Sequence, residues 1–239
     1  MACPTTPHSN HLLAALSPAV RVRLFPLLEL TKLQLYARLH DSHRPVRHIY
    51  FPTNSVITLH YLLEDGSSTA LATVGNEGMV GSNCLLADKS VNFPAQVQSA
   101  GFAYRLQRSL AKEEFDRHSE FLKLVLLYSQ ALMNQVSQTA VCNRNHSIMQ
   151  RFSRWLLISL DRVCSKNLTM TQEFIGNMLG VRREGVSEAA TNLQQLGVIS
   201  YSRGRINVTD RQQLEALACD CYQIIKTDTD QLLNYVRPL

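Results

Sequence analysis

The 239-residue sequence lacks the features that mark several large classes of protein. It has no run of about 18 apolar residues, which a membrane-spanning helix requires, and no basic segment followed by the apolar stretch of a signal peptide. Nucleophile motifs, phosphate-binding loops, metalloprotease helices and carboxylate pairs placed for acid–base chemistry are also absent. The sequence therefore predicts a cytoplasmic protein that has no membrane partner and is not an enzyme.

Cysteine is sparse, with six residues scattered along a chain that carries no export signal, so reduced thiols are favoured over a disulfide framework. Cys142 and His146 are four residues apart, and Cys219 and Cys221 lie near the C-terminus, so a zinc or redox site built from them is conceivable. Cys219 and Cys221 would point in different directions in a helix, however, and the 142–146 interval spans a suspected hinge at 143–145. We therefore expect buried structural thiols, with no metal and no other cofactor.

The composition allows two modest domains with real cores, since 45% of the residues are hydrophobic. A formal net charge of +5 and a pI near 9.0 mildly favour a polyanionic partner.

The segment from Thr169 to Val208 carries the strongest pattern in the chain. Thr171 is a good helix N-cap, and Gly180 provides the sharp break after an apolar helix. A second helical pattern follows at once, with apolar residues on one face. Two short helices joined by a tight glycine-containing turn predict a helix-turn-helix.

Polar side chains lie on the opposite face of this second helix, where a recognition helix presents groups to DNA bases. They are Arg183, Glu184, Ser187 and Glu188. Two short strands then flank Arg203-Gly204-Arg205, which predicts a glycine hairpin with two arginines at its tip. Helix, turn, helix and basic hairpin together predict a winged helix whose wing can touch phosphate.

The N-terminal half has a different character, with short β-type runs broken by turn residues. Candidate strands are 33–36, 48–51, 56–62, 69–74 and a last one around 102–106. Asp65-Gly66 is the strongest hairpin signal, and the glycines of 75–81 indicate a corner. Many short strands with regular turns predict a small barrel or jelly roll.

A long helix is expected from about Ser119 to Asn143, after a short one at 111–118. Its apolar and small residues recur at intervals of four and three, the seam of a two-helix coiled coil. The seam comprises Val125, Ser129, Leu132, Val136 and Thr139. A helix apolar on two sides needs two partners, so we expect its own domain on one side and a second copy of the chain on the other. Complete burial in one domain is the alternative.

A β-roll, a long helix and a winged helix in this order resemble the Crp-Fnr family of bacterial transcription regulators. The resemblance covers nearly the whole chain and is most specific at 171–193, followed by Tyr50-Phe51-Pro52 and the corner at 75–81. It implies an α+β fold with a cyclic-nucleotide-binding-like jelly roll. The expected parts are an N-terminal helical segment (1–29), a β-roll (30–108), a short helix and dimerisation helix (109–145) and a winged helix-turn-helix domain (146–239).

The resemblance also implies roles for single residues. Arg183 occupies the place of a guanine-reading arginine, and Glu184 that of a glutamate accepting a hydrogen bond from cytosine. Glu188 stands where the family often has arginine, which implies an altered site preference. Phosphate contacts are expected from Thr171, Gln172, Arg182, Arg203 and Arg205.

The sensory half departs from the cyclic-nucleotide binders of this family. Those proteins carry Gly-Glu for the ribose and a nearby arginine followed by serine or threonine for the cyclic phosphate. Here Gly81 is followed by Ser82, and the segment containing Pro94 and Ala95 has no arginine. A buried phosphate would lose its main electrostatic partner, so we expect a degenerate effector pocket. An iron–sulfur sensor is also disfavoured, because only Cys3 and Cys84 precede the long helix.

Two functions follow from these patterns. The first is a homodimeric regulator that reads a near-palindromic site in double-stranded DNA, with RNA polymerase as a further partner and room for an unknown small-molecule effector. The second is a ligand- or partner-sensing β-roll whose winged helix mediates protein contacts. The base-reading face of the second helix favours the first.

Overall fold

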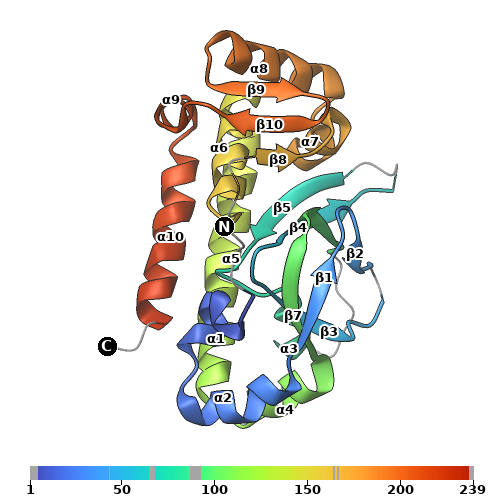
Figure 1. The fold of residues 1–239 in the computed structure, drawn as a ribbon, viewed down its shortest axis with the longest axis vertical. Coiled ribbons are helices and arrows are strands. Elements are labelled where there is room, and N and C mark those ends of the chain that lie inside the picture. The colour runs from blue at the N-terminus through green and yellow to red at the C-terminus, as the bar shows by residue number, and fades with distance from the viewer. Residues whose placement is uncertain are drawn as a thin grey trace.

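The computed structural model describes residues 5–42, 44–64, 68–86, 93–163, 165 and 167–236, and it has a β-roll and a winged helix joined by a long helix (Figure 1). Cys3, Asn92 and the hairpin tip Asp65-Gly66 lie outside these ranges. Within them, none of the helices combines the length and the hydropathy that a membrane crossing requires.

The N-terminal segment is short helices, as predicted, and it is fastened to the β-roll by a residue that the sequence reading missed. α1 (His11–Ala15) and α2 (Pro18–Leu24) are flanked by 3-10 turns at Pro7–Ser9 and Phe25–Leu27. Asn10 caps α1 by accepting from the Leu13 amide, and its own amide group donates to the Pro52 and Gly78 carbonyls at 3.0 and 2.8 Å. One buried side chain thus caps a helix and binds both the end of β3 and the glycine corner of the roll.

Two antiparallel sheets form the roll. One has the order β1-β7-β3 and the other β2-β6-β4-β5. The strands are β1 (Glu29–Leu33), β2 (Arg38–His40), β3 (His48–Pro52), β4 (Val56–Leu62), β5 (Ser68–Val74), β6 (Ala95–Ser99) and β7 (Gly101–Gln107). Side chains from both sheets meet the N-terminal helices and the long helix in one hydrophobic core. The predicted jelly-roll-like architecture is confirmed.

Four strand predictions hold closely and one is wrong. The predicted runs 48–51, 56–62, 69–74 and 102–106 correspond to β3, β4, β5 and β7. The β4–β5 pair that the hairpin signal implied runs to Leu62 opposite Ser68. The run 33–36 instead ends β1 and turns, with Tyr36 at a φ of 64°. Its aromatic ring packs on Phe174 of the C-terminal half at 5.0 Å, a tertiary contact that the local pattern did not contain.

Helices α3 (Asn83–Leu86) and α4 (Arg108–Asp116) lead to α5 (Glu120–Asn145), which Ser119 caps as predicted. The phase of the predicted seam on α5 is wrong at both ends, because Val125 and Thr139 are buried within the chain's own core. The face left exposed is shifted by one residue and carries Leu126, Met133 and Val141 at 48%, 63% and 51% exposure. The four-three spacing alone does not say which of two adjacent stripes faces the roll.

The C-terminal half contains α6 (Ile148–Leu160), α7 (Gln172–Leu179), α8 (Arg183–Gln195), α9 (Arg211–Leu217) and a small sheet of order β8-β10-β9. Its strands are β8 (Asn167–Thr169), β9 (Ile199–Ser202) and β10 (Arg205–Val208). α10 (Cys221–Val236) then leaves this domain and runs back along α5, where Leu232 joins the core of the roll (Figure 1). The helix thus contacts both halves, because Tyr222 and Ile225 near its start lie in the core of the C-terminal half.

A buried ion pair joins the two halves. Arg162, just after α6, donates from Nε to Oε1 of Glu77 at 2.6 Å, and the Gly75 amide donates to the same oxygen at 3.1 Å. The two side chains are only 8% and 10% exposed. The glycine corner thus orients a carboxylate toward the C-terminal half.

Candidate nucleic-acid interface

The helix-turn-helix forms where the sequence predicts it. The Thr171 hydroxyl accepts from the Phe174 amide at 3.1 Å, and Gly180 closes α7 at a φ of 62°, a left-handed conformation that favours glycine. At Gly176 a Cβ atom would lie 2.9 Å from the Val181 carbonyl oxygen, so glycine also allows the turn to fold tightly onto α7.

The recognition helix α8 divides cleanly into two faces. Val186, Ala189, Ala190 and Leu193 are buried in the core beneath it. Arg183, Glu184 and Glu188 are exposed on the outer face, and Ser187 is half-buried beside them. Arg183 is the first residue of α8, so its side chain starts from the helix end that enters a groove in helix-turn-helix complexes.

The wing is a two-residue hairpin. Ser202 pairs with Arg205, and Arg203 and Gly204 between them both have positive φ values of 50° and 75°. Tyr201 anchors the base of the wing by donating to the Met170 carbonyl at 3.2 Å. Burial raises the pKa of Tyr201, so its hydroxyl stays protonated and keeps that bond.

These parts enclose a surface hollow of about 440 Å³ between the start of α7, the outer face of α8 and the wing. Five predicted residues line it: Thr171, Gln172, Arg183, Ser187 and Arg203. Inside it Gln172 accepts from Arg183 Nε at 3.4 Å and donates to the Ser187 hydroxyl at 3.5 Å. Two predicted base-reading groups and a predicted phosphate contact thus share one loosely bonded polar network.

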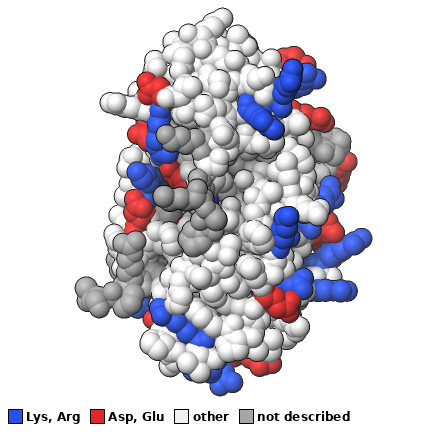
Figure 2. All heavy atoms as spheres, viewed as in Figure 1, with Lys and Arg blue, Asp and Glu red and all other residues white. Residues whose placement is uncertain are grey.

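The remaining predicted DNA contacts lie around the hollow rather than in it. Arg182 is the N-cap of α8 without a side-chain capping bond, and Glu184, Glu188 and Arg205 are exposed. Arg183 forms no ion pair with any described residue, so the neighbouring glutamates do not neutralise its guanidinium. Basic side chains on the face in Figure 2 alternate with acidic ones along the right edge, which gives a mixed surface and not a continuous basic one.

Other residues of this surface were not predicted from the sequence. Thr191 and Gln194 follow Ser187 at intervals of four and three residues and line the same hollow, as does Tyr201. The helical period from Ser187 could have identified the first two, whereas Tyr201 reaches the hollow only through the wing.

The β-roll holds a second cavity, of about 340 Å³, bounded by β4, β5, the corner before α3, and α5. Gly81 and Ser82 line it as predicted, but Pro94 and Ala95 do not; Ala95 is buried where β6 pairs with β4. The walls are mainly apolar: Leu59, Leu71, Met79, Val80, Leu86, Phe93, Leu132, Met133 and Val136.

Among the described residues that line this cavity, His40 is the one with a titratable cationic form. Burial lowers the pKa of His40, and its Nε2 lies 3.0 Å from the His48 carbonyl oxygen. The imidazole is therefore neutral at pH 7.

Together the β-roll, the long helix and the three-stranded wing domain define a winged helix-turn-helix protein with a jelly-roll half. Residues 150–217 match the family model of the Crp-like helix-turn-helix domain, which ends before α10. The sequence matches no curated protein. The chain therefore contains a Crp-like helix-turn-helix domain.

Solved structures with the same fold cover most of the chain. FixK2 from Bradyrhizobium japonicum is 17% identical at a TM-score of 0.68, over 80% of this chain and 98% of that one. TTHB099, a CRP-family transcriptional regulator from Thermus thermophilus, is 21% identical at a TM-score of 0.67, over 79% and 96%. A crp/fnr-family regulator from Eubacterium rectale is 19% identical at 0.65, over 86% and 96%. The chain has the fold of Crp/FNR transcription regulators, as its sequence predicts.

Proposed function

We propose that this protein is a homodimeric, sequence-specific DNA-binding transcription regulator. The observation that carries the proposal is the hollow of the winged helix, where the first turn of α8, the start of α7 and the wing present polar groups to one space. A helix of about 10–12 Å diameter fits the major groove, and its first turn reaches the base edges. Arg183 and Ser187 lie where bases would be read, while Thr171, Gln172 and Arg203 flank them for phosphates.

The dimer would form along the exposed stripe of α5. Leu126, Met133 and Ala140 recur every seven residues on this stripe, and Val141 adds a further exposed apolar side chain. Soluble monomers leave few large apolar side chains in such a line without a partner. Two chains paired there would present two recognition helices to one near-palindromic site. Contacts with RNA polymerase would belong to the bound dimer.

We further infer that the β-roll does not bind a cyclic nucleotide. Its cavity is mainly apolar, and the histidine that lines it is neutral at pH 7. A phosphate monoanion placed there would lose its hydration without gaining a cationic partner among the described residues. The same walls suit an apolar effector, which keeps a sensing role for the roll open to experiment.

The alternative function, a sensing β-roll whose winged helix binds protein, predicts a different response to DNA. The test is to select bound sequences from a random DNA pool with the full-length protein and to measure affinity over a salt series. A specific regulator enriches a near-palindromic motif and binds it less tightly as salt rises, because phosphate contacts release counterions. No enriched motif, together with weak binding to all sequences, would rule out the DNA-reading function.

A further inference from the structure

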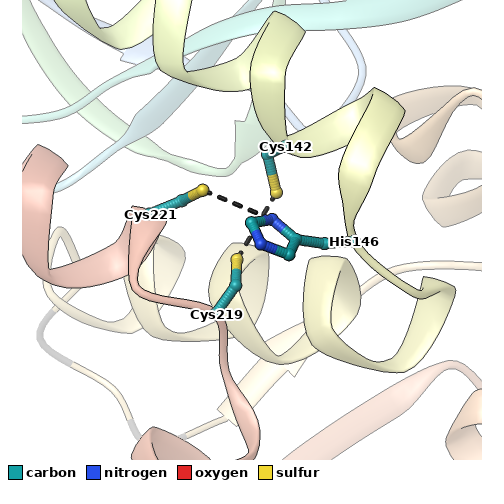
Figure 3. Close-up of side chains that lie close together, drawn as sticks. All are labelled: Cys142, His146, Cys219 and Cys221. Carbon is teal, nitrogen blue, oxygen red and sulfur yellow. Dashed lines mark hydrogen bonds between the residues drawn. The ribbon is translucent and has the colours of Figure 1, made fainter.

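Four potential metal ligands meet where the long helix ends. Cys142 lies in the last turns of α5 and His146 is the residue that caps it, while Cys219 and Cys221 come from the turn between α9 and the start of α10 (Figure 3). Their ligand atoms, three Sγ and one imidazole nitrogen, all lie within 4.8 Å of one another. Two segments more than 70 residues apart in sequence thus converge on one point.

The structure contradicts both sequence-based reasons for expecting no metal site. Cys219 and Cys221 do not sit in one helix, because α9 ends at Leu217 and α10 begins at Cys221, so the turn aims both thiols the same way. The suspected hinge at 143–145 is helical, and the His146 amide donates to the Cys142 carbonyl at 3.1 Å. Residues four apart on a continuous helix share a face.

The distances fit one tetrahedral ion. Around zinc, bonds of about 2.3 Å to sulfur and about 2.0 Å to nitrogen place two sulfurs about 3.8 Å apart, and a sulfur and a nitrogen about 3.5 Å apart. The Cys142 and Cys219 sulfurs are 3.5 Å apart, and Cys221 Sγ is 3.5 Å from His146 Nδ1. A disulfide requires about 2.05 Å, so these thiols are in contact but not bonded.

The surroundings also match a closed metal site. The three cysteines are buried together as a separate small cluster. His146 turns its other nitrogen, Nε2, toward Asp220 at 3.7 Å, the carboxylate arrangement that orients a metal-bound imidazole. The Gln138 amide group donates to Cys221 Sγ at 3.0 Å, a bond that favours the thiolate.

The closeness of the three sulfur atoms also favours a cation. These atoms lie within 4.8 Å of one another. Three thiolates at that separation would repel one another, and a divalent ion between them would offset the repulsion.

We propose that Cys142, His146, Cys219 and Cys221 bind a structural zinc ion. Three thiolates and one imidazole form a standard set for a structural site that leaves no open coordination position. Iron–sulfur clusters are usually held by four cysteines, and a multi-iron core needs more room than ligand atoms 4.8 Å apart enclose. The ion fastens the start of α10 to the end of α5, at the point where the long helix leads into the DNA-binding domain.

The first test measures metal in the full-length protein, purified from zinc-supplemented cells without chelators. Elemental analysis should find about one zinc ion per chain, and the cobalt-substituted protein should show the strong visible bands of a tetrahedral, thiolate-bound ion. Chelating the metal should also lower the midpoint of thermal unfolding, because α10 loses its tether. A protein without zinc, whose freshly reduced form also fails to bind zinc or cobalt, would overturn the proposal.

The second test uses matched serine variants. Cys142→Ser and Cys221→Ser should lose most of the zinc, whereas Cys84→Ser removes an equally buried thiol from α3 and should keep it. If the ligand variants do not fold, cobalt titration of the wild-type chain still decides the matter. A Cys142–Cys219 disulfide located by peptide mapping of the wild type, together with no zinc or cobalt binding after its reduction, would refute the metal site.

Discussion

Arg183 and Glu184 are adjacent on the recognition helix, and their removal should have opposite effects. Arg183→Ala should cost about 1–3 kcal/mol of binding free energy at the selected site and relax the preference at one base pair. An arginine fork can bond both acceptors of a guanine. Glu184→Ala should leave total affinity unchanged or higher, since a charge that phosphates repel is lost, yet blur the preference at its own base. Binding to the site and to each single-base change of it measures both effects.

The matched control for Arg183 is Arg44→Ala, which removes the same charge from an exposed position on the β-roll. It should change affinity little for any sequence. Equal losses on all sequences for Arg183→Ala would reduce that residue to a phosphate contact and assign base reading elsewhere on α8.

Glu77 is the residue whose loss should most disturb the contact between the two halves. Glu77→Ala leaves Arg162 buried without its carboxylate partner, and removing one member of a buried pair costs about 3–5 kcal/mol of folding free energy. Glu29→Ala breaks the exposed Glu29–Arg105 pair and should cost only about 0–1 kcal/mol. Urea denaturation of both variants gives the comparison, and similar small losses would mean that water reaches the Glu77 site.

Residues whose roles are local could be predicted from the sequence. The caps at Ser119 and Thr171, the glycine turn at Gly180 and the two faces of α8 all depend on neighbours a few positions away. The roles of Asn10 and Glu77 could not be predicted, because their partners lie far along the chain. A lone asparagine or glutamate carries no pattern that predicts such a contact.

At the scale of the element, the exposed stripe of α5 allows the proposed dimer to be tested with single substitutions. Met133→Asp places a charge on the exposed stripe of α5 and should give folded monomers with much weaker site affinity, because the paired stripe would bury that charge. Val125→Asp instead places a charge in the monomer core and should reduce folded protein. Sedimentation and circular dichroism separate the two outcomes. A wild-type chain that is monomeric at micromolar concentration would disprove the dimer.

The shift of that stripe shows what a heptad pattern leaves open. Spacing fixes the period of contacts along α5 but not their phase, which depends on where the roll and α10 pack. The helix has a third neighbour, since Tyr128, Ala131 and Gln135 line a crevice with α10 residues such as Ile225. No local signal ties residues 221–236 to α5.

The β-roll as an element should show no specific response to cyclic AMP. Its cavity offers apolar walls and a neutral histidine to a phosphate anion. Calorimetry with millimolar nucleotide should detect no saturable heat, and DNA affinity should not change when the nucleotide is added. Clear micromolar binding would mean that a cation outside the described residues serves the phosphate.

At the scale of the whole molecule, the succession of roll, long helix and winged helix along the chain could be predicted from the sequence, because each part has its own periodicity. The way in which these parts pack against one another could not be predicted. Thr69 on β5 lies within 2.9 Å of where a Cβ of Gly180 would be, and Ala70 joins the core of the DNA-binding half. These contacts hold the helix-turn-helix against the roll, so the two halves pack against each other directly as well as through α5.

Variants of the wing can show how much the two wings of the dimer contribute to the salt dependence of DNA affinity. Arg203 and Arg205 are exposed at the tip and edge of the hairpin, where they would meet backbone phosphates and not bases. Replacing both with alanine removes two positive charges from each chain of the dimer. The slope of log affinity against log salt should then become shallower by roughly 2 to 4, since each phosphate contact contributes about 0.9. The selected base preferences should stay the same, because the α8 contacts remain.

A double variant at Arg38 and Arg44 on the roll removes the same charge elsewhere and serves as the control. If both double variants changed the slope equally, the effect would come from net charge, and the wing would have no direct contact with DNA.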